Sequence, residues 1–369
     1  MSLLEALINV SEKAANIARL CRQEQHLFEL LVEEKSSSES NPRFVQDFKT
    51  LADVLIQETV KYDIGLQFPE LKESIKGEED NVFCNTIGEK IVVQIQPDVT
   101  STANLLQTVL NGADVAARLL AEEVHRNISL KEIDVYLDNI PKDVALDYGQ
   151  LGIWIDPIDS TAEYIHAKEV VGVSGICVNG LKCVTVLIGV FDKLTGIPVM
   201  GVVNQPFFKP VDNRWSGRCY WGLTTPSITV SSLTVNHSID NQSNVICIST
   251  SEDGNIKRKL QGAGFNLIEA AGAGYKILTV ITRQAAAYVL SKNTTFKWDT
   301  CGPQAILKSI GGNIVQYNAV NGNHCKPIEY PTHSGNGDVN KIKLYCNDGG
   351  IIAFYNEEVL TKIMDALCN

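Results

Sequence analysis

An acidic, proline-containing motif directly after a short apolar run constrains this chain most. The run LGIWI (151–155) predicts a buried strand, and DPIDST (156–161) follows it. Asp156 and Asp159 lie three residues apart, and Pro157 opposes a continuous helix across them. Two carboxylates on such a turn can converge on one or two hard cations through their oxygen atoms. The motif therefore predicts a strand, an acidic turn and then a helix.

Ser160 and Thr161 complete this motif at the predicted start of the helix. Free backbone N–H groups at a helix N-terminus favour a phosphate group, so a metal and a phosphate can share one turn. An isolated motif of this kind is equally compatible with an Asp-Pro turn that an Asx cap and an N-cap serine stabilise. These residues alone leave both interpretations open.

The charge balance excludes several classes of partner. The chain has 32 Lys and Arg against 43 Asp and Glu, a net charge of −11 and a pI of about 5.1. Nucleic acids and anionic membranes are bound by basic surfaces, so we expect neither as a partner. If the substrate is an anion, bound cations are expected to bridge it to this acidic protein.

The cysteines and the N-terminus predict a cytoplasmic protein. Ten cysteines are scattered along the chain without a CxxC pair, so zinc ribbons and thioredoxin-like motifs are not supported. Free thiols are typical of a reducing compartment. The first 20 residues read as an amphipathic helix without the basic start of a signal peptide. We also expect a monomer.

Hydrophobic periodicity predicts a layered α/β or α+β fold. The expected helices cover residues 2–33, 50–62, 98–125 with a break at Asn111-Gly112, 255–264, and 303–310 starting at Pro303. The expected strands cover residues 151–155, 184–191, 197–203, 218–223, 244–250, 267–272, 285–290 and 313–318. Residues 34–43 are expected to form a loop. A Ser/Thr/Asn-rich stretch at 224–243 predicts two domains, 1–240 with a large insert at about 80–150, and 241–369.

Three further acidic positions are candidates for the same site. GEED (77–80) places acidic residues beside a glycine, Asp53 falls in the first turn of a helix, and Asp299 precedes the helix expected to open at Pro303. Each also has a structural interpretation: a solvated acidic loop, an exposed residue favoured by the helix dipole, and an N-cap. Because an acidic residue in the first turn of a helix is usually exposed, we expect Asp53 to be exposed.

Other catalytic patterns fit less well. AAGAGYK (270–276) offers close backbone approach and a cation at Lys276, but it lacks both the Walker pattern and the third glycine of a dinucleotide fingerprint. The sequence has no HExxH motif and no G-x-S-x-G elbow. A carboxylate-bound Mg²⁺ site is therefore the favoured chemistry.

Taken in order, five segments resemble the Mg²⁺-dependent, lithium-sensitive phosphomonoesterases, the superfamily of inositol monophosphatase. These are K-T-L-A-D (49–53), G-E-E (77–79), W-I-D-P-I-D-S-T (154–161), G-A-G-Y-K (272–276) and K-W-D (297–299). The resemblance implies an α/β/α/β/α sandwich with its site at a domain interface.

Within that superfamily, the long connection between Glu78 and Asp156 is similar to that of the members that act on inositol polyphosphates. It implies removal of the 1-phosphate from inositol 1,4-bisphosphate and inositol 1,3,4-trisphosphate, with lithium as an inhibitor. The alternative is a 3′-phosphoadenosine 5′-phosphate phosphatase. A non-catalytic inositol-phosphate sensor is disfavoured, because the ligand set is complete.

The resemblance also assigns roles to residues. It implies two or three Mg²⁺ ions bound by Glu78, Asp156, the carbonyl of Ile158, Asp159 and Asp299, with Asp53 able to reach a metal. It implies that Asp53 and Thr161 orient and deprotonate the attacking water, with Glu79 beside the metals. It implies substrate contacts at Asp159, Ser160, Thr161, Ser251, Gly272, Ala273, Lys276 and Thr294.

Two positions depart from the family pattern. Asp80 stands where a serine is usual and adds charge near the metals. Asp253 stands where a lysine that contacts a second phosphate is expected. Loss of that cation is expected either to weaken binding of the second phosphate or to transfer its role to Lys257 or Arg258.

Overall fold

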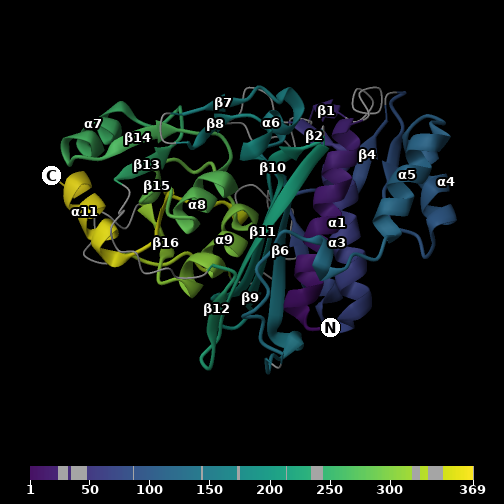
Figure 1. The fold of residues 1–369 in the computed structure, drawn as a ribbon, viewed down its shortest axis with the longest axis horizontal. Coiled ribbons are helices and arrows are strands. Elements are labelled where there is room, and N and C mark those ends of the chain that lie inside the picture. The colour runs from purple at the N-terminus through teal and green to yellow at the C-terminus, as the bar shows by residue number, and fades with distance from the viewer. Residues whose placement is uncertain are drawn as a thin grey trace.

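The computed structural model describes residues 1–23, 32–34, 48–85, 87–142, 144–172, 175–212, 214–233, 244–317, 325–330 and 344–368. Two sheets dominate the fold, and helices lie outside and between them (Figure 1). The sequence prediction of a layered α+β fold is confirmed.

The first sheet has six strands in the order β12-β11-β10-β9-β6-β3. Their bounds are β3 Ile75–Gly77, β6 Leu151–Asp159, β9 Thr185–Asp192, β10 Pro198–Val211, β11 Arg214–Thr224 and β12 Thr229–Ser231. All neighbours are antiparallel except β3 and β6, which are parallel.

The second sheet has five strands in the order β14-β13-β15-β17-β16. Their bounds are β13 Val245–Ile248, β14 Asn266–Glu269, β15 Ala287–Leu290, β16 Asn313–Gln316 and β17 Ile351–Phe354. Strand β13 is parallel to both of its neighbours, whereas β17 is antiparallel to β15 and β16.

The helices form three layers around these sheets (Figure 1). Helices α1 (Leu3–Gln23) and α3 (Leu51–Gln67) cover the outer face of the first sheet, α8 (Ala273–Ile281) and α9 (Lys297–Ser309) lie between the sheets, and α7 (Gly254–Gly262) and α11 (Glu357–Cys368) lie beyond the second sheet. Helix α5 (Asp114–His125) lies beside α1, and α4 (Val99–Val109) packs against α5.

Short elements complete the described chain. These are the two-stranded pairs β1 Val32–Glu34 with β2 Phe48–Thr50, β4 Val82–Cys84 with β5 Lys90–Val92, and β7 Val170–Val171 with β8 Cys177–Asn179, the helix α6 Thr161–His166, and the 3-10 turns Pro69–Ser74, Leu130–Glu132, Tyr148–Gln150 and Leu181–Cys183. In the described part of the chain, no helix is both long enough and apolar enough to span a bilayer.

Alternation along the central strands divides the apolar residues into two cores. Ile153 and Ile155 of β6 belong to the core shared with α1 and α3, whereas Trp154 belongs to the core shared with α8 and α9. Successive strand side chains point to opposite faces, so this sheet is buried on both sides. That double burial explains why β6 reads as a continuous apolar run.

Glycines allow α9 to lie close against the first sheet. A Cβ on Gly201 would lie 2.0 Å from the carbonyl oxygen of Gly302, and one on Gly189 would lie 2.3 Å from the Gly302 nitrogen. Both contacts involve backbone atoms, which cannot move aside as the end of a side chain can. Helix α9, and with it Asp299, is therefore fixed against β9 and β10.

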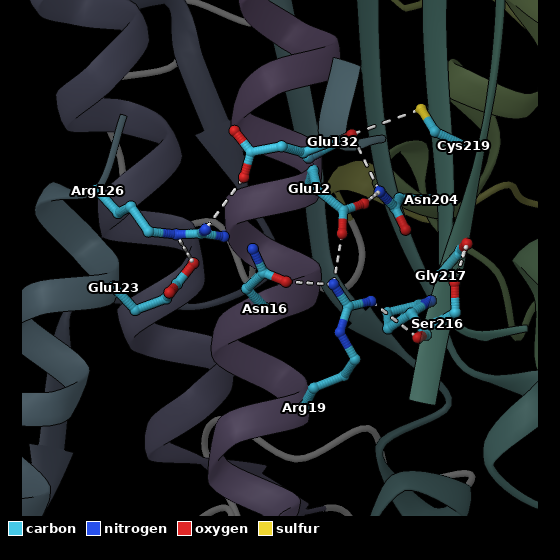
Figure 2. Close-up of polar contacts among 12 residues, drawn as sticks. Glu12, Asn16, Arg19, Glu123, Arg126, Glu132, Asn204, Ser216, Gly217 and Cys219 are labelled. Carbon is cyan, nitrogen blue, oxygen red and sulfur yellow. Dashed lines mark hydrogen bonds and ion pairs between the residues drawn. The ribbon is translucent and has the colours of Figure 1, made fainter. Parts of the chain in front are cut away.

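A buried polar network fastens α1 to β10 (Figure 2). The Arg19 guanidinium pairs with Glu12 and donates to the Pro206 carbonyl at 2.9 Å, and Asn204 donates to Glu12 at 2.9 Å. Loss of one partner would leave the other charge buried and unpaired, which is strongly destabilising.

Several predicted boundaries are corrected. The helix expected over residues 2–33 ends at Gln23, and residues 32–34 form β1; residues 24–31 and 35–47, including most of the expected loop, lie outside the described residues. The helix expected over 50–62 extends to Gln67, whereas the break at Asn111-Gly112 is confirmed. The sequence prediction missed β17 and α11. The two-domain division stays a prediction, since residues 234–243 are not described.

Candidate active site

Three carboxylates from two elements meet at one point. Asp156 and Asp159 belong to β6, Asp299 belongs to α9, and one carboxylate oxygen from each lies within 4.8 Å of the others. All three side chains are buried. The structure therefore brings together three of the predicted metal ligands, and their role in metal binding stays a prediction.

The acidic motif lies on a strand and not on a turn, which corrects the prediction. Strand β6 continues through Pro157 to Asp159, and its pairing with β9 shifts between Asp156 and Asp159. Such an irregularity lets two residues three positions apart serve one site. The strand ends at Asp159, the next residue Ser160 has a left-handed φ of 75°, and α6 begins at Thr161.

Asp299 lies inside α9 and not before it, because the helix begins at Lys297 instead of Pro303. Its Oδ2 accepts a hydrogen bond of 2.5 Å from the Phe296 N–H, a group at the start of the helix that has no partner within the helix. Pro303 lies inside the helix, where its missing N–H removes one backbone bond. The proline therefore misled the prediction of the helix start.

The three carboxylates are buried close together and repel one another. Burial, followed by the neighbouring charge of Glu78, raises the pKa of Asp156 well above its usual value. Burial, followed by the charge of Asp159, does the same to the pKa of Asp299. Asp156 Oδ1 is buried without a hydrogen-bond partner. A hard cation fits this site, because it supplies both the missing partner and the missing positive charge.

Asp159 also joins β6 to the start of α8. Its carboxylate accepts hydrogen bonds from the N–H of Ala273 at 3.2 Å, the N–H of Gly274 at 2.9 Å and the hydroxyl of Thr185 at 3.2 Å. Gly272 precedes the helix with a φ of 72°, and a Cβ there would lie 2.6 Å from the Cys183 carbonyl oxygen. Glycine is therefore required at this position, and the predicted substrate contacts Gly272 and Ala273 are placed beside the carboxylates.

Lys276 brings a buried positive charge to the same site. Its Nζ donates to the Ala270 carbonyl at 2.8 Å and lies 5.0 Å from the centre of the Tyr288 ring. Burial lowers its pKa, and the Asp159 carboxylate opposes that shift. The lysine that follows the glycines is thus aimed at the site and is not a surface residue.

Asp53 is buried, contrary to the expectation that it is exposed. Its Oδ2 accepts hydrogen bonds from the Thr50 hydroxyl and from the Thr50 N–H at 2.7 Å, whereas its Oδ1 is buried without a partner. Burial, reinforced by the charge of Glu79, raises the pKa of Asp53 to about 8. Thr50 and Asp53 form a capping box at the start of α3, and both side chains are buried.

Thr161 is not joined to Asp53 by a hydrogen bond in this structure. Its hydroxyl donates instead to the Ile158 carbonyl at 3.2 Å. The Ile158 carbonyl and the Thr161 hydroxyl are therefore adjacent, and both residues line the cavity described below.

The GEED segment brings Glu78 and Glu79 to the edge of the carboxylate cluster. Glu78 lines the cavity, and its charge contributes to the raised pKa values of Asp53, Asp156 and Asp299. Glu79 is buried and lies 3.7 Å from the Lys49 ammonium. Asp80 pairs with the same ammonium at 2.5 Å, so its charge is compensated.

A cavity of about 310 Å³ opens beside the cluster. Predicted site residues that line it are Glu78, Asp156, Ile158, Asp159, Ser160, Thr161, Gly272, Ala273, Lys276, Thr294 and Asp299. Asp53, Glu79 and Ser251 do not belong to this lining. Ser251 instead lies exposed on the loop after β13, where its hydroxyl is 3.1 Å from that of Ser249.

Sequence reasoning missed several residues of the cavity wall. These are Ala162, Ser249, Thr250, Ala270, Ala271, Tyr288, Thr295, Phe296 and Trp298. Ser249 and Thr250 directly follow the carboxyl end of β13, which is a usual place for ligand contacts in such sheets. That signal was available, whereas the aromatic residues offer none beyond their apolar character.

A model of the inositol monophosphatase family matches residues 3–353. Inositol polyphosphate 1-phosphatase of Bos taurus is 42% identical over 392 residues, which cover 99% of this chain and 96% of that protein. The Homo sapiens protein of the same name is also 42% identical, with the same coverage. 3′(2′),5′-bisphosphate nucleotidase 1 of Rattus norvegicus is 24% identical over 100% of this chain and 97% of that protein.

Solved structures share the fold. An extragenic suppressor protein from Bartonella henselae matches with a TM-score of 0.53 at 14% identity, covering 100% of this chain and 98% of that one. An IMPase/NADP phosphatase complexed with Mg²⁺ and phosphate matches with a TM-score of 0.53 at 14% identity, covering 95% and 90%.

Proposed function

The chain belongs to the inositol monophosphatase family and is a phosphomonoesterase, and on this premise we propose that it removes the 1-phosphate of inositol 1,4-bisphosphate and inositol 1,3,4-trisphosphate, with Mg²⁺ required and lithium inhibitory. The observation that carries the proposal is the buried Asp156–Asp159–Asp299 cluster, with an unpartnered oxygen, at the wall of a cavity that also contains Lys276. The inositol polyphosphate specificity rests on the full-length relatives of that name.

Five groups would hold the metal. These are the carboxylates of Glu78, Asp156, Asp159 and Asp299 and the carbonyl of Ile158. Oxygen ligands of this kind are those that Mg²⁺ prefers. Bound Mg²⁺ ions supply charge neutralisation of the phosphate, a more acidic water and stabilisation of the leaving alkoxide.

The chain's own residues would move one proton and hold the substrate. Thr161 orients the attacking water, and Asp53 accepts its proton through the Thr161 hydroxyl. The unpartnered Asp53 Oδ1 and its raised pKa support a role as a base. Glu79 lies beside Asp53 and helps to set that pKa. Closing the link requires the Thr161 hydroxyl to leave the Ile158 carbonyl.

The remaining predicted contacts would hold the substrate. Ser160 and Thr161 hold the departing phosphate, assisted by Asp159. The inositol ring and its other phosphates are held by Ser251, Gly272, Ala273, Lys276 and Thr294. Lithium inhibition, the number of metal ions, the cytoplasmic location and the monomeric state stay predictions.

A nucleotide bisphosphate is the alternative substrate, and binding it would require an aromatic ring in the cavity wall that is free to stack on the base. Phe296 and Trp298 line the cavity, but their rings stack on each other with centroids 4.8 Å apart. Both are buried, at 7% and 6% exposed, so little ring surface is left for a purine base. The wall therefore favours a small sugar-like ring.

Phosphate release from inositol 1,4-bisphosphate and from 3′-phosphoadenosine 5′-phosphate, each with Mg²⁺ and with or without lithium, tests the proposal. We expect release of only the inositol 1-phosphate, blocked by lithium, and none from an Asp156→Asn variant. Preference for the nucleotide would overturn the substrate assignment. Release that persists in EDTA would overturn the metal site.

A further inference from the structure

We propose that Lys292 supplies the positive charge that binds the second phosphate of a bisphosphate substrate. The proposal rests on the proposed function, because it concerns the part of the substrate that does not react. Its basis is the place of Lys292 where two cavity-lining loops meet.

The cavity lacks enough positive charge for two phosphates. Among the described residues that line it, Lys276 is the only basic one. The Lys276 ammonium already donates to the Ala270 carbonyl, and its charge is opposed by Asp159. Bound Mg²⁺ would neutralise the reacting phosphate, whereas the second phosphate brings about −1.5 to −2 further charges near neutral pH. A cation besides Lys276 must lie at the rim, because the described wall has no other basic residue.

Lys292 lies at this rim. It is in the short connection between β15 and α9, two residues before the cavity-lining Thr294. Its ammonium donates to the Ser251 carbonyl, in the loop whose preceding residues Ser249 and Thr250 also line the cavity. The Lys292 side chain is exposed. An ammonium has three donors, and a carbonyl takes only one of them, so two remain for a phosphate.

The two loops are fastened together, which keeps Lys292 in place. The buried carboxylate of Glu252 accepts hydrogen bonds from the Ser291 hydroxyl at 2.5 Å and from the Ser291 N–H at 2.9 Å. These bonds join the residue after Ser251 to the residue before Lys292. The cation is therefore positioned before substrate arrives, which reduces the entropy lost on binding.

The other nearby cations are less suited to this role. Lys257, an expected replacement for a lysine at position 253, pairs with Glu269 at 2.6 Å and also donates to the Thr250 carbonyl at 3.1 Å. Asp253 itself caps α7, accepting from the N–H of Asn255 at 2.8 Å. No described carboxylate forms an ion pair with Lys292, so its charge is not neutralised as that of Lys257 is.

Variants Lys292→Gln and Lys292→Glu test the proposal against the matched control Lys257→Gln. For Lys292→Gln we expect kcat/KM for inositol 1,4-bisphosphate to fall about tenfold, the worth of one charge-assisted hydrogen bond, and more for Lys292→Glu. The inhibition constant of inorganic phosphate, which reports on the reacting phosphate site alone, is expected to stay within twofold. Lys257→Gln is expected to leave both values nearly unchanged, and Lys292→Arg to retain most of the activity.

Three outcomes separate the possibilities. Equal loss of bisphosphate turnover and phosphate binding in Lys292→Gln would assign Lys292 a structural role and overturn the proposal. Unchanged kcat/KM in Lys292→Glu would also overturn it. If the unmodified protein releases no phosphate from the bisphosphate, the proposed function fails and this inference fails with it. If the unmodified protein is active and Lys292→Glu is equally active, only this inference fails.

Discussion

The side-chain amide of Asn347 holds the turn from which Asp299 enters the carboxylate cluster. Its Nδ2 lies 2.9 Å from the Phe296 carbonyl oxygen and 3.3 Å from the Thr295 hydroxyl, and its backbone N–H donates to the Thr295 carbonyl at 2.8 Å. The Phe296 N–H in turn donates to Asp299. A residue late in the chain thus positions a proposed metal ligand.

Replacing Asn347 with Leu is expected to raise the Mg²⁺ concentration for half-maximal activity about tenfold. The substitution leaves buried backbone and hydroxyl groups without a partner, at about 1–3 kcal/mol, and loosens the turn that presents Asp299. Titration of phosphatase activity with Mg²⁺ measures this effect.

Gln304→Leu is the matched control for that experiment. Gln304 is also a buried amide of α9, but its Nε2 donates to Asn313, at 2.9 Å, and to the carbonyls of Ile314 and Ile328. Its Oε1 accepts from the Tyr330 hydroxyl, so its link to the turn that presents Asp299 is indirect. We expect a lower melting temperature with an unchanged Mg²⁺ requirement. An equal shift in Mg²⁺ requirement for both variants would show that general destabilisation, and not the turn, is responsible.

Asp53→Asn is expected to lower kcat by about 10²- to 10⁴-fold while the protein stays folded. An asparagine side-chain oxygen can still accept from the Thr50 N–H, so the cap at the start of α3 is retained. The change also removes a buried charge beside Glu79. Steady-state kinetics and circular dichroism are the measurements. A folded variant with full activity would exclude Asp53 as the base.

The metal-free protein is expected to lose stability as the pH rises from about 4 to about 8. In the unfolded chain an aspartate titrates near about 4, whereas burial raises the folded-state pKa of Asp53 to about 8 and those of Asp156 and Asp299 well above normal. Between these values the folded state keeps protons that the unfolded state has released, so each unit of pH lowers the free energy of unfolding. Thermal melting in EDTA across this range measures the trend, and saturating Mg²⁺ should restore stability most at the alkaline end. A melting temperature that rises with pH in EDTA would contradict the assignment.

Gly201→Ala is expected to destabilise the protein by about 3 kcal/mol and to weaken Mg²⁺ activation. The new methyl group would lie 2.0 Å from the Gly302 carbonyl, so α9 must move away from the sheet and take Asp299 with it. Gly262→Ala, in α7 with open space around it, is the control and should gain about 0.5–1 kcal/mol. Urea unfolding compares the two. Equal stability of both variants would show that the close approach is not required.

Local patterns in the sequence predicted many residues of the candidate site. The three-residue spacing of Asp156 and Asp159 indicated shared ligation, and the structure brings both to Asp299. The same reasoning placed Asp53 on the surface, because helix position alone does not reveal which face a neighbouring layer covers. Burial of that face depends on the contact of α3 with the first sheet, which is a tertiary property.

Contacts between residues far apart in the chain could not be predicted from the sequence. Asn347 gave no signal, since its role arises only where the chain returns to the start of α9. Pro303 gave a misleading signal, because proline usually marks the first residue of a helix and here lies inside one. Lys292 gave no signal either, because its contact with the loop after β13 is formed only in the folded chain.

The origin of the carboxylate cluster in two elements has a mechanical consequence. Strand β6 contains no cysteine, so no disulfide joins it to α9. An ion bound by Asp156, Asp159 and Asp299 would act as a reversible cross-link between them, worth about 2.7 kcal/mol at a hundred times its dissociation constant. Packing of α9 against the sheet would then strengthen ion binding, and ion binding would strengthen that packing by the same free energy. A chelator would therefore destabilise the centre of the molecule.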